Sequence, residues 1–275
     1  MELSCLGRGM TEPFLKWAGG KRWMTGLETL PKADAFRRYL EPFLGGGAVF
    51  FKLQPTTAIL SDLNGELINL YRAVRDEPEE LRTLLEQHHR DHSREHYYAV
   101  RANMPLDTVK KAARTLYLNR TCWNGLYRVN RKGEFNVPIG TKTSVITESE
   151  DFTKISQTLK AAELRSCDFA STIEEAGKGD FLFVDPPYTM KHNMNGFIKY
   201  NENIFTWADQ LRLRDAVTGA AKRGAAIMIT NADHESLREL YARDFTYMSL
   251  SRSSVLSAKS SGRGPTTEAM FTVNL

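Results

Sequence analysis

Short apolar runs alternate with longer amphipathic segments along most of this chain. The lengths and composition expected of buried strands recur at residues 39–43, 58–62, 163–169, 181–184, 224–231, 245–250 and 268–274. Helical spacing of apolar residues predicts helices from residue 48, over 63–75, 78–89, 108–119, 207–222 and 233–242, and up to about residue 162. Alternating strands and helices predict an α/β fold around a largely parallel sheet.

One of these apolar runs ends in an acid and two prolines. Residues 181–184 are followed by Asp185, Pro186, Pro187 and Tyr188. Proline lacks an N–H and has a fixed φ, so strand pairing stops there and the turn is stiff. Open α/β sheets bind ligands outside the carboxyl ends of their strands, where a carboxylate, carbonyl oxygens and a ring suit a flat amino-bearing heterocycle. A proline turn with an aspartate cap is the simpler alternative.

A glycine loop follows the first predicted strand. Residues 45–47 are all glycine, and an apolar helix start follows at residues 48–53. Strand, glycine loop and helix form the first step of a nucleotide-binding unit, because glycine lets the backbone approach a ligand closely. The spacing matches neither the dinucleotide fingerprint nor a P-loop, so a phosphate cradle is not predicted.

Two further loops carry charged side chains suited to a ligand. Trp17, a Gly-Gly pair and Lys21 make a close-approach loop beside a cation, which fits a carboxylate or phosphate. A plain glycine turn before a helix is the alternative. Asp62 ends the second predicted strand, where such folds bind ribose hydroxyls. Its alternative role is an N-cap for the helix that starts near Asn64.

The composition is that of an ordinary globular protein with an uneven charge. The 275 residues are 41% hydrophobic and 25% charged, which suits one large domain or a domain with an insertion. The net charge is only +4, yet residues 101–142 hold nine Lys or Arg against two acids, and residues 249–267 hold no acid. Two basic segments without counter-charges favour a polyanionic partner over plain solvated surface.

Residues 119–138 combine aromatic and basic side chains between two turn signals. Asn124-Gly125 and Lys132-Gly133 predict a hairpin-like loop. The interleaved aromatic and basic residues are Trp123, Tyr127, Phe135, Arg120, Arg128, Arg131 and Lys132. Stacking faces beside phosphate-seeking cations are typical of nucleic-acid binding, and an arginine can also read guanine. Anchoring of the aromatics in the core is the alternative, which we favour for Phe135.

Neither metal binding nor membrane insertion is predicted. Three scattered cysteines show no metal-ligand spacing, and four histidines between residues 88 and 96 lie in a polar, acid-rich helical segment, so we interpret them as surface residues. No apolar run is long enough to span a bilayer, and the first residues lack a secretory signal. We therefore expect a cytoplasmic protein with reduced thiols.

Together these motifs resemble the Dam-type DNA adenine-N6 methyltransferases over nearly the whole chain. The carrying segments are residues 14–21, 41–47, Asp168-Phe169, Asp185-Pro186-Pro187-Tyr188 and the hairpin at 119–140, in the family's order. The resemblance implies a Rossmann-like class I methyltransferase core with a mostly parallel seven-stranded sheet. It also implies an inserted, largely helical target-recognition domain, with residues 1–75 and 148–275 forming the core and 76–147 the insertion.

The resemblance further implies S-adenosylmethionine as cofactor and double-stranded DNA as partner, bound by a monomer or weak dimer without metal. Implied catalytic residues are Asp185, Pro186, Pro187 and Tyr188. Implied cofactor-binding residues are Trp17, Ala18, Gly19, Gly20, Lys21, Glu41, Pro42, Phe43, Gly45, Gly46, Asp62, Asp168, Phe169 and Asp185. Implied DNA-binding residues are Lys16, Arg120, Trp123, Asn124, Leu126, Arg128, Arg131, Lys132 and Pro138.

The expected reaction is direct transfer of a methyl group to the N6 amino group of an adenine flipped out of the duplex, within GATC or a related site. Asp185 and the Pro186 carbonyl would accept hydrogen bonds from that amino group, and Tyr188 would stack on the base. Three alternatives stay open: the same fold acting on RNA adenine or DNA cytosine-N4, a catalytically silent DNA-binding regulator, and a purely structural protein. A glutamine methyltransferase ranks low, because Asn would be more usual at the position of Asp185.

Overall fold

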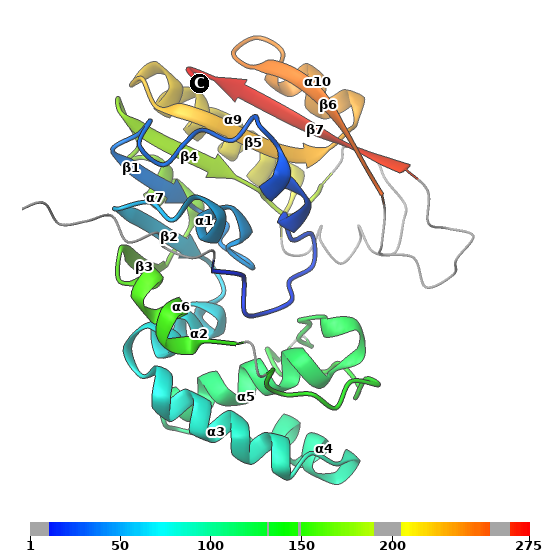
Figure 1. Ribbon diagram of the computed structural model, residues 1–275. Coiled ribbons are helices and arrows are strands. Elements are labelled where there is room, and N and C mark those ends of the chain that lie inside the picture. The colour runs from blue at the N-terminus through cyan, green and yellow to red at the C-terminus, as the bar shows by residue number, and fades with distance from the viewer. Residues whose placement is uncertain (1–10, 131, 148–149, 190–204, 254–264) are drawn as a thin grey trace, which may run out of the picture. The chain divides into compact units, whose positions relative to one another are not determined.

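The structure is a computed structural model that describes residues 11–130, 132–147, 150–189, 205–253 and 265–275 (Figure 1). The chain divides into two compact units that interleave in sequence. The helical unit comprises Met1–Thr25, Gly45–Gln54 and Asn64–Leu164, and the sheet unit comprises Gly26–Leu44, Pro55–Leu63 and Arg165–Leu275. The division into residues 1–75, 76–147 and 148–275 stays a prediction.

The described strands form one sheet of seven in the order β3-β2-β1-β4-β5-β7-β6. β1 pairs in parallel with β2 and β4, and β4 pairs in parallel with β5. β7 is antiparallel to both β5 and β6. The strands are β1 (Arg38–Glu41), β2 (Ala58–Asp62), β3 (Ala162–Ser166), β4 (Asp180–Val184), β5 (Ala226–Ala232), β6 (Thr246–Ser253) and β7 (Pro265–Val273). The predicted mostly parallel seven-stranded sheet is confirmed.

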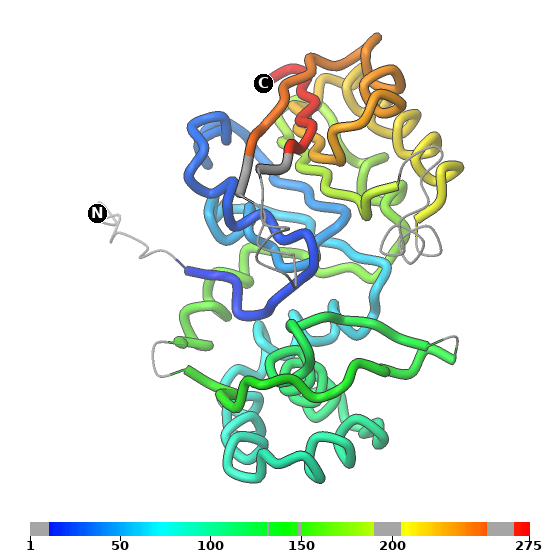
Figure 2. Tube along the Cα trace, turned by 90° about the vertical axis from the view of Figure 1, so that its right-hand side faces the viewer, coloured from blue at the N-terminus to red at the C-terminus, as the bar shows by residue number. Residues whose placement is uncertain are grey.

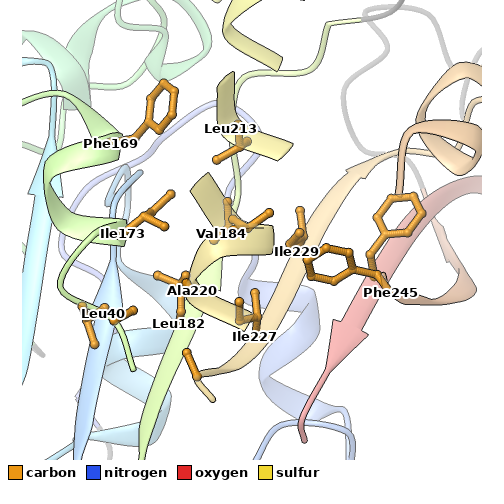
Figure 3. Packing of buried hydrophobic residues seen from close by; sticks show 14 of the residues in the cluster. Leu40, Phe169, Ile173, Leu182, Val184, Leu213, Ala220, Ile227, Ile229 and Phe245 are labelled. Carbon is orange, nitrogen blue, oxygen red and sulfur yellow. The ribbon is translucent and has the colours of Figure 1, made fainter. Parts of the chain in front are cut away.

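One face of the sheet is covered by α7 (Phe169–Ile173), α9 (Trp207–Lys222) and α10 (Glu235–Tyr241). Figure 3 shows Leu40, Leu182 and Ile227 of the strands packed beneath Ile173 and Ala220 of the helices. Side chains alternate along a strand, so the neighbours of these residues point to the opposite face. The five polar strand residues described below lie on that opposite face.

The helical unit is organised around α5. This helix packs against α2, α3 and α4, and its apolar face is buried, as its periodicity predicts. Asp107 caps the start of α5 and Asn64 caps the start of α2. The helices of this unit are α1 (Ala48–Leu53), α2 (Gly65–Asp76), α3 (Pro78–Arg90), α4 (Arg94–Ala102), α5 (Thr108–Thr121) and α6 (Phe152–Leu159), with short 3-10 turns at η1 (Arg22–Gly26) and η2 (Trp123–Gly125).

Beyond α5 the chain forms an arm, residues 122–140, whose two sides run out together and back (Figure 2). Two isolated bridges join the sides, Val129 to Phe135 and Cys122 to Ile139. The predicted hairpin-like loop is therefore present, although its sides are too irregular to count as strands. Phe135 is buried, as expected. Arg131, one of the predicted DNA-binding residues, lies outside the described residues.

Among the described helices, none combines the length and apolar character that a bilayer crossing requires.

Candidate active site and nucleic-acid interface

One polar side chain per strand lines a single face of the sheet. The registers between β2, β1, β4, β5 and β7, combined with the alternation of side chains, place Asp62, Glu41, Asp185, Thr230 and Glu268 on that face. They lie toward the carboxyl ends of the parallel strands, on the face opposite α7 and α9. We call these five residues the polar row. Such a row at the ligand-binding edge of an α/β sheet is the candidate active site.

Asp185, at the end of β4, is held by a neighbouring strand. The Thr230 hydroxyl on β5 donates a hydrogen bond of 2.8 Å to Asp185 Oδ1. Thr230 is fully buried, whereas Asp185 is partly exposed. A fixed carboxylate that still reaches solvent can accept hydrogen bonds from a ligand without reorganising. Pro186, the next residue, is buried.

Tyr188 is held from another strand. Its hydroxyl donates a hydrogen bond of 2.7 Å to Glu268 Oε2 on β7. Glu268 is only 2% exposed, while Tyr188 is partly exposed. The acid and the ring of the proline turn are thus each tied to a buried strand residue.

Glu41 makes the centre of the polar row electrostatically unusual. It is buried at the end of β1 and accepts a hydrogen bond of 3.0 Å from the Tyr39 hydroxyl. Burial raises the pKa of Glu41 well above its ordinary value; the Tyr39 hydrogen bond opposes this, and the charges of Asp185 and Asp62 add to it. The charges of Asp185 and Asp62 beside this buried group favour a cationic ligand at the centre of the polar row.

Asp62 does not cap helix α2, which was the alternative to a ligand-binding role. The N-cap of α2 is Asn64, whose side chain accepts hydrogen bonds from the backbone N–H groups of Glu66 and Leu67. Asp62 is partly exposed at the end of β2. This position keeps it compatible with a ligand role.

Asp168 and Phe169 stand at the start of α7. Asp168 caps that helix and pairs with Arg212 at 3.0 Å. Phe169 is buried and stacks on Phe43, with ring centroids 5.4 Å apart. Pro42 is also buried. Helix capping, an ion pair and ring stacking therefore explain how these residues are held in the sheet unit, and their predicted cofactor roles stay predictions.

In the helical unit, Trp17 packs tightly against the glycine loop. A Cβ on Gly45 would lie 2.7 Å from Trp17 Cδ1, and Gly45 has a φ of +46°, so both space and backbone require glycine there. On its other side Trp17 stacks with Tyr127 of the arm, with centroids 5.3 Å apart. Tyr127 also donates a hydrogen bond of 3.2 Å to Glu66. The first motif, the glycine loop and the arm thus meet at Trp17.

The rest of the first motif is a turn around Lys21. Lys21 is buried, and its Nζ donates a hydrogen bond of 2.7 Å to the Gly19 carbonyl. Ala18, Gly19 and Gly20 are exposed. Lys21 thus lies beside exposed backbone, and the role of this loop in binding an anion stays a prediction.

The base of the arm is tied to the first motif. Asn119 accepts a hydrogen bond from the Lys16 backbone N–H at 3.0 Å and donates one to the Lys16 carbonyl at 2.8 Å. The Lys16 side chain is exposed, and burial of part of it together with Lys142 nearby lowers its pKa. Arg120 pairs with Glu150 and donates to the Phe14 and Val145 carbonyls. Because these partners occupy the guanidinium, Arg120 acts as an internal brace.

The other predicted DNA-binding residues that the structure describes in the arm are exposed or partly exposed. Trp123 is 49% exposed, a large value for tryptophan. Arg128 is exposed, with its Nε donating to Asn136 at 2.8 Å. Asn124 has a φ of +56° at the arm's first turn. Asn124, Lys132 and Pro138 are exposed, and Leu126 is partly exposed. Their exposure leaves these side chains accessible, and their roles in DNA binding stay predictions.

The histidine cluster corrects one sequence interpretation. His88, His92 and His96 are half-buried around Tyr117, whereas His89 is exposed, as the sequence interpretation expected of all four. His88 Nδ1 lies 3.0 Å from His96 Nε2, and burial lowers the pKa of His88 to about 4. In the part of the chain that the structure describes, no group of three or more His, Cys, Asp or Glu is arranged to hold a metal ion. Burial also raises the pKa of Cys122 to about 11.

Sequence reasoning missed Thr230 and Glu268. A signal was present in both cases, since each is a polar residue next to apolar residues of a predicted strand, where a buried polar group needs a partner. The partner could not be identified without the strand registers.

Comparison with known proteins adds the family context. A model of the D12 class N6 adenine-specific DNA methyltransferase family matches residues 17–255. The type II methyltransferase M1.LlaDCHI of Lactococcus lactis subsp. cremoris is 38% identical over 269 residues, covering 94% of each chain. The DNA adenine methylase of Escherichia coli (strain K12) is 32% identical over 243 residues, covering 84% of each. The DNA N-6-adenine-methyltransferase of Escherichia phage P1 is 38% identical over 82% of this chain and 30% of the phage protein.

Proposed function

This chain belongs to the D12 class N6 adenine-specific DNA methyltransferases, and we propose that it uses S-adenosylmethionine to methylate a short site in double-stranded DNA. Methylation of adenine N6 in DNA follows from the family, which confirms the resemblance drawn from the motifs. The donor, the recognition site and the extrusion of the base are the proposed parts. GATC or a related sequence is the expected site.

The polar row supports this donor. When bound, S-adenosylmethionine supplies a methyl group activated by a positively charged sulfonium. Asp62 and Asp185 make this edge of the sheet electronegative, which favours that cation and its amino group, whereas burial raises the pKa of Glu41 so that its carboxyl group keeps a proton. Asp62 at the end of β2 suits ribose hydroxyls. The roles of Trp17, Lys21 and the glycine loop, which belong to the helical unit, stay predictions from the sequence.

Asp185 carries the catalytic proposal. The target amino group is conjugated with the adenine ring and is a poor nucleophile. Hydrogen bonds from its N–H groups to Asp185 and the Pro186 carbonyl would take the nitrogen lone pair out of conjugation with the ring and direct it at the methyl group. The Thr230 hydrogen bond fixes one carboxylate oxygen in advance, so this alignment needs no reorganisation at the moment of reaction.

The target base must leave the duplex to reach this turn, since a stacked adenine cannot present its amino group in line. Tyr188, three residues after Asp185, is partly exposed and can stack on the extruded base. Stacking on an aromatic side chain is worth roughly 1–3 kcal/mol per base. This offsets part of the cost of unstacking.

The arm of the helical unit is the proposed DNA contact. Trp123 offers a stacking face, while Lys132 and Arg128 offer cations for phosphate or guanine. Arg120 is omitted from these contacts because Glu150 and two backbone carbonyls occupy it. We propose that the protein acts in the cytoplasm as a monomer or weak dimer on DNA.

The observation that carries the proposal is the Asp185 carboxylate, partly exposed at the end of β4 and fixed by a buried threonine. The test is methyl transfer from labelled cofactor to duplex DNA with adenine, duplex DNA without adenine, and RNA. Only the first should be labelled, and Asp185→Ala should abolish labelling while keeping the wild-type melting temperature. Labelling of cytosine-only DNA or RNA, or turnover of the variant within tenfold of wild type, would refute the proposal. Single-molecule sequencing of DNA from expressing cells then gives the site.

A further inference from the structure

The hydrogen bond between Tyr188 and Glu268 joins the turn after β4 to β7, which is separated from β4 in the sheet by β5. Glu268 lies on β7, paired with Ala232 at the end of β5, and is buried at 2% exposure. Tyr188 is 80 residues earlier in the chain, after the two prolines. Its hydroxyl reaches Glu268 Oε2 at 2.7 Å, the short distance expected when a carboxylate accepts from a hydroxyl.

This bond constrains the direction of the Tyr188 ring. The prolines at 186 and 187 fix the backbone that leads to the residue. The side chain still has two torsions, so the backbone alone does not set the plane of the ring. The hydroxyl is the atom farthest from the backbone, and a partner on a strand holds it more rigidly than a partner on a loop. The ring is therefore fixed at both ends.

We propose that Glu268 is a positioning residue for methyl transfer, holding the Tyr188 ring at the angle needed to stack on the extruded adenine. The proposal rests on the proposed function, because it takes Tyr188 as the stacking ring. Its physical basis is that small misplacements at a reacting centre reduce rates strongly. Thr230 fixes the Asp185 carboxylate in the same way from the adjacent strand, so both working side chains of the turn are aligned by the polar row.

A merely structural role for Glu268 predicts a different outcome. A carboxylate is costly to bury, and methionine, which has a similar size, removes that cost. The Tyr188 hydroxyl then loses its acceptor, but Tyr188 is partly exposed and can bond to water instead. If Glu268 only filled space, methionine would serve as well. If it positions Tyr188, methionine should preserve the fold and impair the reaction.

The experiment compares Glu268→Met, which removes the acceptor, with Glu268→Gln, which keeps one. Tyr188→Phe removes the donor of the same hydrogen bond, and Glu239→Met is the control at an exposed position in α10 of the sheet unit. Single-turnover rates and KM are measured with duplex DNA containing one target adenine. A second duplex carries 2-aminopurine at the target position, whose emission rises when the base is extruded and falls when it stacks on a ring.

We expect the rate of Glu268→Met to fall about 10- to 100-fold with little change in KM, the size of one hydrogen bond to a charged group. Glu268→Gln should stay within about threefold of wild type, as should Glu239→Met. Emission of the 2-aminopurine complex should be higher with Glu268→Met, because the ring no longer stacks reliably. Tyr188→Phe should match its rate loss, and the double variant should be no slower than either single one.

Each other outcome has a defined meaning. If Glu268→Met keeps both the rate and the emission of wild type, the positioning role is wrong. If Glu268→Met does not fold, Tyr188→Phe decides, and a rate within threefold of wild type overturns the proposal. If the wild-type protein labels no adenine in duplex DNA, the proposed function fails instead, independently of any variant.

Discussion

Alanine at Gly45 should disrupt the meeting point of the first motif, the glycine loop and the arm. Gly45 has a φ of +46°, and an L-residue in the left-handed region costs roughly 1–2 kcal/mol. The new Cβ would also lie 2.7 Å from Trp17 Cδ1 and 3.2 Å from its Nε1, so the indole must move. Its stack on Tyr127 would then be lost, which is worth about 0.5–1.5 kcal/mol. The expected destabilisation is about 2–3 kcal/mol.

Gly46 is the matched control one residue later. Its φ is not positive, and a Cβ there would meet Trp17 Cβ at an ordinary 3.5 Å. Gly46→Ala should therefore be neutral, or stabilise by about 0.4–1 kcal/mol through the unfolded chain. Urea unfolding followed by far-UV circular dichroism and tryptophan emission measures both variants. Stabilities of the two variants within about 0.5 kcal/mol of each other would refute the close-packing argument.

Three further changes test other parts of the structure. Thr230→Val keeps the side-chain shape but removes the donor to Asp185, so single-turnover methylation should slow about 10- to 100-fold, and an unchanged rate would show that the bond is unimportant. Lys132→Ala should reduce the slope of log Kd against log salt for duplex DNA by about one, as measured by fluorescence anisotropy, whereas an equal slope would exclude a phosphate contact. Because the pKa of Glu41 is raised, the folded protein retains a proton that the unfolded chain loses above about pH 4.5. The free energy of unfolding of the wild type therefore falls as the pH rises from about 4.5 toward the raised pKa. Glu41→Gln removes this loss, and its gain in melting temperature over wild type should grow from pH 5 to 8; a constant difference would contradict the assignment.

Much of the fold could be predicted because its strands are short apolar runs with marked ends. The run 181–184 and the helix 207–222 were located within a residue, since a proline turn and a Thr206 capping box delimit them. Helix α4 was missed because it is short and mostly polar, with Tyr97 its one fully buried residue. The strand predicted at residues 163–169 ends earlier, at Ser166. Asp168 instead caps the short helix α7, which begins at Phe169.

The site was predictable only where a motif and a strand end coincide. Asp185, Glu41 and Asp62 each follow an apolar run, so their shared edge could be inferred from the sequence. Thr230 and Glu268 became visible only through the register of β5 and β7, which depends on contacts between distant segments. The histidines near residue 90 were misjudged for the same reason, since Tyr117 that covers them lies on another helix.

The pairing of β1 with β4 also sets an order on how the protein is made. Arg38 of β1 pairs with Asp180 of β4, and the whole of α2 to α6 lies between them in sequence. During synthesis, β1 therefore leaves the ribosome long before β4, and its pairing with β4 cannot form until the helices between them have been synthesised. The helices can pack locally in that interval, whereas the centre of the sheet closes only after β4 appears. The polar row, which needs β1, β4, β5 and β7 together, is then among the last features of the molecule to form.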